Sequence, residues 1–413
     1  MDTDRCFKIN VMSQQDRETI TFAGGVRAQI SCLTVAGGVT EYHVMIHVQP
    51  VGKKFQEQMM AVAGAAGELL SGRLAGGVVL FKRYFLSDAA NQKSVLDLYE
   101  RESVCAGAAT ESVGAAPAYT IVEQPPLDGS KIALWMYVLV PDTQDAEGFV
   151  YTEKADFRSL EHHGYRHLFW HGTIAEHLDS KEQSYKLWES YLNALAMQRA
   201  NLAEHCIRTW FFVQNVDVNY AGVVQARNEV FDREGLTCNT HFIASTGICG
   251  RFSTPQEIVG MEAYAIVGIR PEQIGYLYAC DYLNPTYEYG VAFERGTYVD
   301  YGDRRQVFIS GTASINNRGE VVYPGDIVRQ TLRMWENVAA LLAEAGMDFS
   351  DVGHIIVYLR DPSDYDVVNE LFECRFPDIP RVFVWAPVCR PGWLIEMECM
   401  ATQKREQNLF TVY

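Results

Sequence analysis

Apolar residues recur at intervals of three and four after Asp326, and this spacing predicts an amphipathic helix. Trp335, Val338 and Leu342 lie on one face of that helix, which is therefore expected to be buried. Asp326 stands at the position of an N-cap, and Gly346 follows the last turn, where glycine commonly ends a helix.

Strands and a second helix are predicted after it. Residues 352–359 (VGHIIVYL) are rich in β-branched side chains, and residues 393–401 (WLIEMECMA) alternate as a closing strand does. Between them, Asp361 and Pro362 begin a helix that runs through about Cys374. This order predicts an α+β unit, a mixed β-sheet covered by two helices on one face.

The same order of motifs occurs twice. Residues 183–191 read QSYKLWESY, and residues 330–338 read QTLRMWENV. Each is preceded by a strand with a small turn, LFWHGTIA or VFISGTAS, and is followed by an apolar strand and then by NEVF at Asn228 or NELF at Asn369. Matches in one order favour duplication.

A weaker third copy is expected near the N-terminus. Residues 55–70 align with the C-terminal helix so that Gln58 meets Gln330, and YFLSD then meets VYLRD. The predicted boundaries are a degenerate unit at 1–145, a second unit at 150–275 and a site-bearing unit at 290–413, with a polar linker at 141–148 and a tyrosine-rich connector at about 270–304.

Charge and apolar content exclude several classes of partner. The 413 residues include 35 Lys and Arg against 52 Asp and Glu, and the resulting charge of -17 repels phosphate backbones, so no nucleic-acid partner is expected. The chain shows no signal-peptide pattern and no run of 18 apolar residues, which predicts a cytoplasmic protein without a membrane partner.

Five histidines lie between His162 and His177, and imidazole is a common metal ligand. The stretch has no helical pair of histidines with a glutamate between them, and residues 167–171 are predicted as part of a strand. We therefore expect packed or surface histidines and no metal site.

The C-terminal copy resembles the Rid family, also called YjgF, in the motifs ISGTAS, GDIVRQTLRMWENVAALLAEAG, IIVYLRDPSDYDVVNELF, IPRVF and LIEMECMA. The resemblance implies a chorismate-mutase-like fold and homotrimers with active sites in the clefts between subunits. Three copies in one chain then imply an intramolecular pseudo-trimer, present as a monomer or a small homo-oligomer.

The resemblance implies roles for three residues of this copy. Arg381 stands where Rid proteins keep the arginine that clamps a substrate carboxylate, a task that suits a planar guanidinium. Glu396 stands at the position of a glutamate that moves protons, and Asn369 matches a polar residue near the pocket. The second copy has Gly260 at the glutamate position and the first has no acid there, so we expect one competent site.

A closer resemblance is to the chorismatases, through VCRPGWLIEMEC, RTWFFV followed by ASTGICG, and ISGTASI. It covers residues 165–401 and implies hydrolysis of chorismate to an aromatic or dihydroaromatic acid and pyruvate. Simple Rid deaminases usually lack the Cys389-Arg390 pair. This chain departs from chorismatases by an extra N-terminal copy, and residues 287–305 follow their Tyr/Arg-rich approach to the site only loosely.

The alternation of the last strand places Glu396 and Glu398 on one face. Two neighbouring carboxylates disfavour each other's ionisation, so one is expected to keep its proton and act as a general acid toward an enolpyruvyl methylene. The alternative is an exposed acidic sheet face.

Arginines flank the loop before that strand. Arg381 and Arg390 are expected to clamp the two carboxylates of such a substrate, and the alternative is a pair of surface ion-pair partners. Cys389 either assists with a ring intermediate or is a buried small residue.

Small and aromatic residues complete the candidate site. Gly311 and Ala313 permit close approach of the backbone to a ligand. Tyr289 belongs to the tyrosine-rich connector, whose side chains line an aromatic pocket or pack one repeat against the next.

Three functions stay open. The first is a chorismatase-like hydrolase or lyase, the second a Rid-type enamine/imine deaminase using the same arginine and glutamate, and the third a non-catalytic small-molecule-binding module. Each takes a small carboxylate ligand, and none is expected to need a cofactor.

Overall fold

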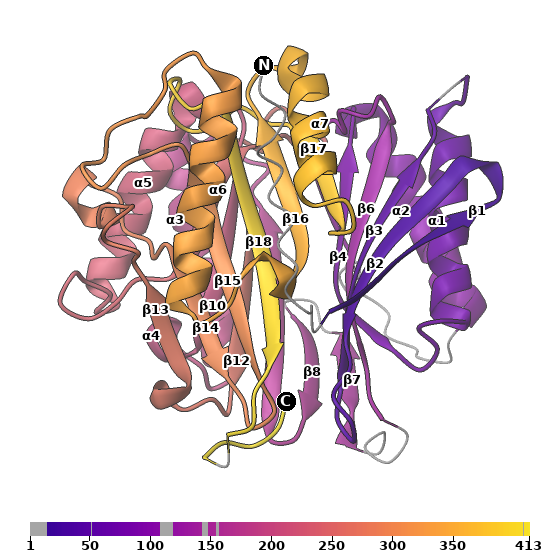
Figure 1. Cartoon of the computed structure of the whole chain (residues 1–413), viewed down its shortest axis with the longest axis horizontal. Helices are drawn as coiled ribbons and strands as arrows, with labels where there is room; N and C mark the ends of the chain where they lie inside the picture. The colour runs from indigo at the N-terminus through magenta and orange to yellow at the C-terminus, as the bar shows by residue number, and fades with distance from the viewer. Residues whose placement is uncertain (1–14, 51, 108–118, 143–147, 154–156, 408) are drawn as a thin grey trace.

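The structure is a computed structural model that describes residues 15–50, 52–107, 119–142, 148–153, 157–407 and 409–413. Most of the expected linker, residues 143–147, lies outside them. The described residues form three six-stranded sheets with one shared strand order, which confirms three tandem α+β units (Figure 1). In this part of the chain no helix is long and apolar enough to cross a membrane.

The three sheets have matching strands at matching places. The first has the order β1-β2-β3-β6-β4-β5 and consists of β1 (Asp16–Phe22), β2 (Val26–Leu33), β3 (Thr40–Val48), β4 (Val78–Leu86), β5 (Thr120–Glu123) and β6 (Ile132–Val140). The second has the order β7-β8-β9-β12-β10-β11 and consists of β7 (Val150–Glu153), β8 (Arg158–His162), β9 (Tyr165–Thr173), β10 (Cys206–Val213), β11 (Ala244–Cys249) and β12 (Val259–Val267). The third has the order β13-β14-β15-β18-β16-β17 and consists of β13 (Ile274–Leu277), β14 (Gly296–Asp300), β15 (Arg304–Ala313), β16 (Val352–Leu359), β17 (Arg381–Trp385) and β18 (Ile395–Lys404). Strand β13 lies inside the segment expected to be a connector.

Two long helices cover each sheet. They are α1 (Phe55–Ser71) and α2 (Ala89–Gly107), α3 (Ser180–Met197) and α5 (Val216–Arg233), and α6 (Ile327–Glu344) and α7 (Tyr365–Arg375), with a short α4 (Leu202–His205) in the second unit. Helix α6 follows the sequence pattern closely, because the Asp326 side chain accepts a hydrogen bond from the Arg329 amide and Gly346 takes the left-handed conformation at φ 72°.

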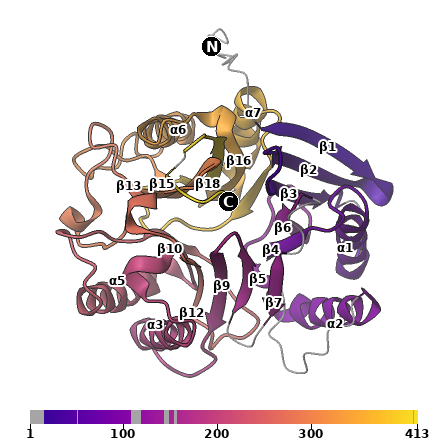
Figure 2. The ribbon, with the colours of Figure 1, turned by 90° about the horizontal axis from the view of Figure 1, so that it is seen from below.

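The units stand around a common centre, with their sheets facing inward and their helices outward (Figure 2). Apolar side chains from all three sheets meet there. The rings of Phe81 and Phe169, from the first and second units, are 4.3 Å apart, and Phe308 of the third packs 5.6 Å from Tyr264. Burial of these faces joins the repeats into one body.

Neighbouring units pair around the ring. The second helix and the edge strand of one unit lie against the central strands of the next: α5 and β11 of the second unit against β15 and β18 of the third, and α7 and β17 of the third against β2 and β3 of the first. The clefts between units are therefore built from two different copies.

Candidate active site

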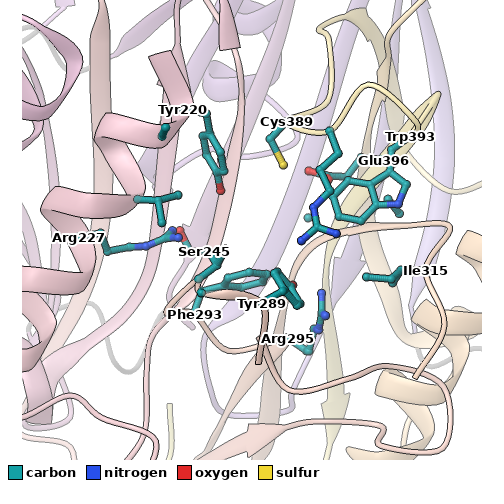
Figure 3. Close-up of a pocket in the computed structure, with 18 of the residues that line it drawn as sticks. Tyr220, Arg227, Ser245, Tyr289, Phe293, Arg295, Ile315, Cys389, Trp393 and Glu396 are labelled. Atoms are coloured by element: carbon teal, nitrogen blue, oxygen red, sulfur yellow. The ribbon is translucent and has the colours of Figure 1, made fainter. Parts of the chain in front are cut away.

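A cavity of about 340 Å³ opens between the second and third units (Figure 3). The second unit contributes α5 and β11, and the third contributes β15, β18 and the segments that precede β14 and β18. The lining residues are Tyr220, Ala221, Val224, Gln225, Arg227, Ser245, Gly247, Tyr289, Gly290, Val291, Phe293, Arg295, Gly311, Ala313, Ile315, Cys389, Arg390, Trp393 and Glu396.

Glu396 is the acid of this cavity. It lies near the start of β18, opposite Tyr358 and Ala313 on the neighbouring strands, and is 5% exposed. Burial raises the pKa of Glu396 to about 8, and the adjacent negative charge of Glu398 adds to this, against the opposing effect of Arg208 and Arg295. Glu396 therefore carries a proton at neutral pH and can donate it.

Three arginines line the same cavity without forming ion pairs with the described residues: Arg227 on α5, Arg295 before β14, and Arg390 in the loop before β18. Arg227 is 1% exposed, and its Nε and Nη2 have no hydrogen-bond partner among the described residues. Buried guanidinium groups are normally paired, so the cavity is suited to a ligand with negative charge.

Aromatic rings form the walls between these cations. The guanidinium of Arg390 lies 4.5 Å from the Tyr289 ring and 4.8 Å from the Trp393 ring, and that of Arg295 lies 5.4 Å from Phe293. These contacts fix the orientation of the arginines and leave an apolar slot between them. The arrangement fits a flat ring that carries carboxylates.

Cys389 also faces the cavity, and its thiol is in the protonated form. Burial raises the pKa of Cys389 to about 12, and the charge of Glu396 adds to this, against the opposing effects of Arg390 and Arg227. A thiolate nucleophile is therefore not available at neutral pH.

Gly311 and Ala313 form the floor beside the acid. A Cβ atom at Gly311 would overlap the Glu396 carboxyl group, which explains why glycine is needed here. The Gly311 amide donates to the Thr246 hydroxyl over 2.8 Å, so its role is to leave space and not to bind a ligand oxygen.

Six of the predicted residues meet in this cavity: Tyr289, Gly311, Ala313, Cys389, Arg390 and Glu396. Arg381 and Asn369 do not line it. The expectation that Arg381 and Glu396 belong to one site is therefore wrong. These two residues line a cavity of about 40 Å³ between the third and first units, beside Arg27, His47 and Asp128.

The correction has a geometrical cause. Arg381 begins edge strand β17, which faces the first unit, whereas Glu396 faces the second. Its guanidinium is also occupied, since it donates to the carbonyl oxygens of Phe376 (2.6 Å) and Ile379 (3.2 Å) and pairs with Glu373.

The strand registers locate the equivalent positions. Arg381 pairs with Ile355 on β16, and Ser245 pairs with Thr209 on β10, so the second unit supplies Ser245 to the cavity of Glu396 at the place of the arginine. Gly260 in the second unit and Ala133 in the first stand at the position of Glu396.

Sequence reasoning missed the contributions of α5 and of the segment before β14, above all Tyr220, Arg227, Phe293 and Arg295. A signal was present in the repeat itself, because NEVF matches NELF. Asn228, the counterpart of Asn369, holds the segment that lines this cavity: its amide group donates to Gly290 O (2.9 Å) and its Oδ1 accepts from the Ala292 amide (3.1 Å).

Two histidines of the histidine-rich stretch pack into the core, whereas His177 is exposed. His162 and His167 are buried with their rings stacked 4.9 Å apart, and burial lowers the pKa of both. No group of three or more His, Cys, Asp or Glu side chains in the described part of the chain is placed to hold a metal ion.

Comparison with known proteins identifies the C-terminal unit most directly. The family model described as Endoribonuclease L-PSP matches residues 292–403. A RutC family protein of Pyrococcus abyssi is 36% identical over 97 residues, which are 23% of this chain and 76% of that protein. The 3-aminoacrylate deaminase RutC of Acinetobacter baylyi is 31% identical over 97 residues, 23% of this chain and 77% of that protein.

A solved structure matches the fold of most of this chain. The crystal structure of a chorismatase aligns with a TM-score of 0.60 at 18% identity and covers 88% of this chain and 99% of its own, which shows a shared fold. This coverage extends beyond residues 165–401 into the first unit, so the expectation that the N-terminal copy is an addition to the chorismatase architecture is wrong. The sequence relationships place the chain itself in the Rid family, whose model carries the description Endoribonuclease L-PSP.

Proposed function

We propose that the cavity between the second and third units is the active site of a chorismatase-like hydrolase or lyase. Its substrate is chorismate or a related cyclic acid with an enolpyruvyl group and a second carboxylate. The observation that carries the proposal is that three cations, Arg227, Arg295 and Arg390, line one cavity with the protonated Glu396 and with aromatic side chains.

These residues support hydrolysis of the enolpyruvyl ether by general acid catalysis. Glu396 protonates the enolpyruvyl methylene, which becomes a methyl group and leaves an oxocarbenium carbon. Water adds to that carbon and returns a proton to the Glu396 carboxylate. The resulting hemiketal collapses with cleavage of its bond to the ring oxygen, releasing pyruvate and a ring alcohol, which can lose water to form a hydroxybenzoate.

The arginines act on both ends of such a substrate. A carboxylate beside the developing positive charge needs a fixed partner, and so does the ring carboxylate. Tyr289, Phe293 and Trp393 hold the ring between these partners and limit access of water. The neutral Cys389 thiol contacts the same space and is a candidate for guiding the ring intermediate.

An imine deaminase is the second candidate, favoured by the relatives that carry that name, among them the 2-iminobutanoate/2-iminopropanoate deaminase of Mus musculus, 29% identical over 101 residues. The separation of Arg381 from Glu396 weighs against it, because the expected pair does not share a cavity.

Two parallel assays distinguish the candidates. Pyruvate is measured after incubation with chorismate, and ammonia after addition of freshly generated 2-aminoacrylate. Pyruvate release that is lost in Glu396→Gln supports the hydrolase. Release of ammonia without pyruvate supports the deaminase. If neither product forms, the remaining candidate is a binding module, which a direct measurement of chorismate binding tests.

A further inference from the structure

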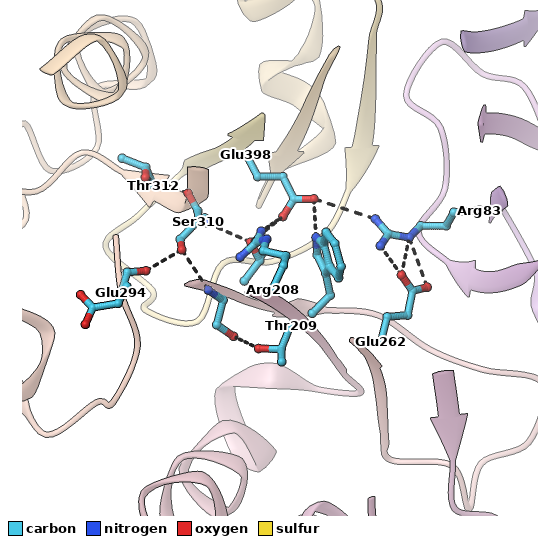
Figure 4. A network of polar contacts seen from close by, with 12 residues as sticks. Arg83, Arg208, Thr209, Glu262, Glu294, Ser310, Thr312 and Glu398 are labelled. Atoms are coloured by element: carbon cyan, nitrogen blue, oxygen red, sulfur yellow. Dashed lines mark hydrogen bonds and ion pairs between the residues drawn. The ribbon is translucent and has the colours of Figure 1, made fainter. Parts of the chain in front are cut away.

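A cluster of four buried charges joins the three units (Figure 4). Arg83 comes from β4 of the first unit, Arg208 and Glu262 from β10 and β12 of the second, and Glu398 from β18 of the third. Their side chains are 1–5% exposed. Arg83 pairs with Glu262 and lies 3.9 Å from Glu398, and Arg208 is 2.8 Å from Glu398. Two cations thus balance two anions, as buried charges require.

Several donors hold the Glu398 carboxylate in place. It accepts hydrogen bonds from Arg208 (2.8 Å), from the Trp210 indole (2.9 Å) and from the Thr246 hydroxyl. Thr246 also accepts the bond from Gly311, so the same group connects the cluster to the floor of the cavity.

Glu396 stands two residues earlier on the same face of β18 and shares none of these donors. The charged and titratable groups that face it are Glu398 on its own strand, Arg208 on β10, Arg295 before β14, Tyr358 on β16, Tyr220 and Arg227 on α5, and Cys389 and Arg390 in the preceding loop. Glu398 is the one anion in this set, and it is fixed in place by its donors.

We propose that Glu398 is a positioning residue for the proton of the active site: its fixed negative charge, held by Arg208, Trp210, Thr246 and Arg83, keeps the Glu396 carboxyl in its acid form. This rests on the proposed use of Glu396 as a general acid. It also gives the first unit a part in the site, because that unit supplies Arg83 to the cluster although it has Ala133 at the position of the acid.

The repeat provides a matched control. Glu262 is the counterpart of Glu398 in the second unit, since Gly260 pairs with Phe212 as Glu396 pairs with Tyr358. Glu262 is equally buried and is paired with an arginine, but the residue two positions before it is glycine. A loss of stability from an unpaired buried arginine is thus common to both positions, whereas control of a neighbouring carboxyl belongs to Glu398 alone.

The test is a titration of Glu396 in the ligand-free, full-length protein labelled with [δ-¹³C]glutamate. Its resonance is assigned by its absence in Glu396→Gln. Glu398→Gln should lower the pKa of Glu396 by about one unit or more, because the anion is removed while Arg208 stays. Glu262→Gln should give less than half that shift.

A double variant guards against misfolding of Glu398→Gln. Arg208→Gln/Glu398→Gln removes a cation and an anion together, and a smaller downward shift is expected because Glu398 acts on Glu396 more strongly than Arg208 does. An unchanged Glu396 titration in both Glu398 variants, or an equal shift in Glu262→Gln, would overturn the proposal. The titration needs no substrate, so it can fail while pyruvate release succeeds, and the reverse also holds.

Discussion

Two cavities between units differ in their volume and in the side chains that line them, although the units around them share one fold. The cavity between the second and third units is about 340 Å³ and combines a protonated acid with arginines that have no carboxylate partner in the described part of the chain. The cavity between the third and first units is about 40 Å³, and its arginine, Arg381, is bonded to carbonyls of its own unit and to Glu373. Arg227 is available to a ligand, whereas Arg381 holds its own unit together.

The difference teaches how duplication divides a site. Each cleft takes an edge strand and helix from one copy and central strands from the next, so two halves on different copies can diverge independently. Glu396 and Arg381 belong to one copy yet serve different clefts. The cleft that contains Glu396 has Ser245 at the position equivalent to Arg381. Its cations come instead from α5 and from the segment before β14.

Removing the acid should have the largest effect. Glu396→Gln keeps the shape of the side chain but cannot donate the same proton, so pyruvate release from chorismate should fall by about 100-fold or more with substrate affinity largely retained. The control is Glu373→Gln in the other cavity, for which turnover should stay within about twofold. Equal losses in the two variants would contradict the assignment of the site to the larger cavity.

Exchanging the arginines tests the contrast directly. Arg227→Gln should raise KM by about 10- to 100-fold, the equivalent of one lost charge-assisted hydrogen bond of about 1.5–3 kcal/mol. Arg381→Gln should instead lower the thermal unfolding temperature and leave KM nearly unchanged, because its guanidinium bonds the backbone of its own unit. A KM that rises in Arg381→Gln and not in Arg227→Gln would restore the expectation drawn from the sequence.

The pH dependence sharpens the role of the larger cavity. Because the pKa of Glu396 is raised to about 8 and the proton-bearing form is active, kcat/KM should be level near pH 7 and fall about tenfold per pH unit above about pH 8. Cys389→Ala should keep this limb in place, since burial raises the pKa of that thiol to about 12. If the fall in kcat/KM above pH 8 is absent in Cys389→Ala, the proton belongs to Cys389 instead.

The smallest effect is expected at the floor of the site. Gly311→Ala places a methyl group against the Glu396 carboxyl and should destabilise the protein by about 1–3 kcal/mol, as overpacking does, and reduce turnover. Gly64→Ala in α1, where no atom lies within 4 Å of the added carbon, should stabilise by about 0.5–1 kcal/mol. Both changes in the free energy of unfolding are measured by urea unfolding. An unchanged free energy in Gly311→Ala would show that the Glu396 side chain can move away from the added methyl group.

The sequence alone determined the units and the faces of their elements. Local periodicity and end signals placed α6 between Asp326 and Gly346 and strand β16 at 352–359, because such patterns depend on neighbours three or four residues apart or on alternate residues. Alternation put Glu396 and Glu398 on one face, and the repeated motifs showed three copies.

Only the tertiary structure decided which residues share a cavity. Pairing of units around a centre brings α5 and Arg227 to Glu396 and carries Arg381 to the first unit, a choice that depends on packing between segments far apart in sequence. It also placed Arg83 of the first unit within 3.9 Å of Glu398. Periodicity reports which face of an element is buried but not which unit covers it. This is why Glu396 and the nearby Arg390 could be located in advance, whereas Arg227 and Arg295 could not.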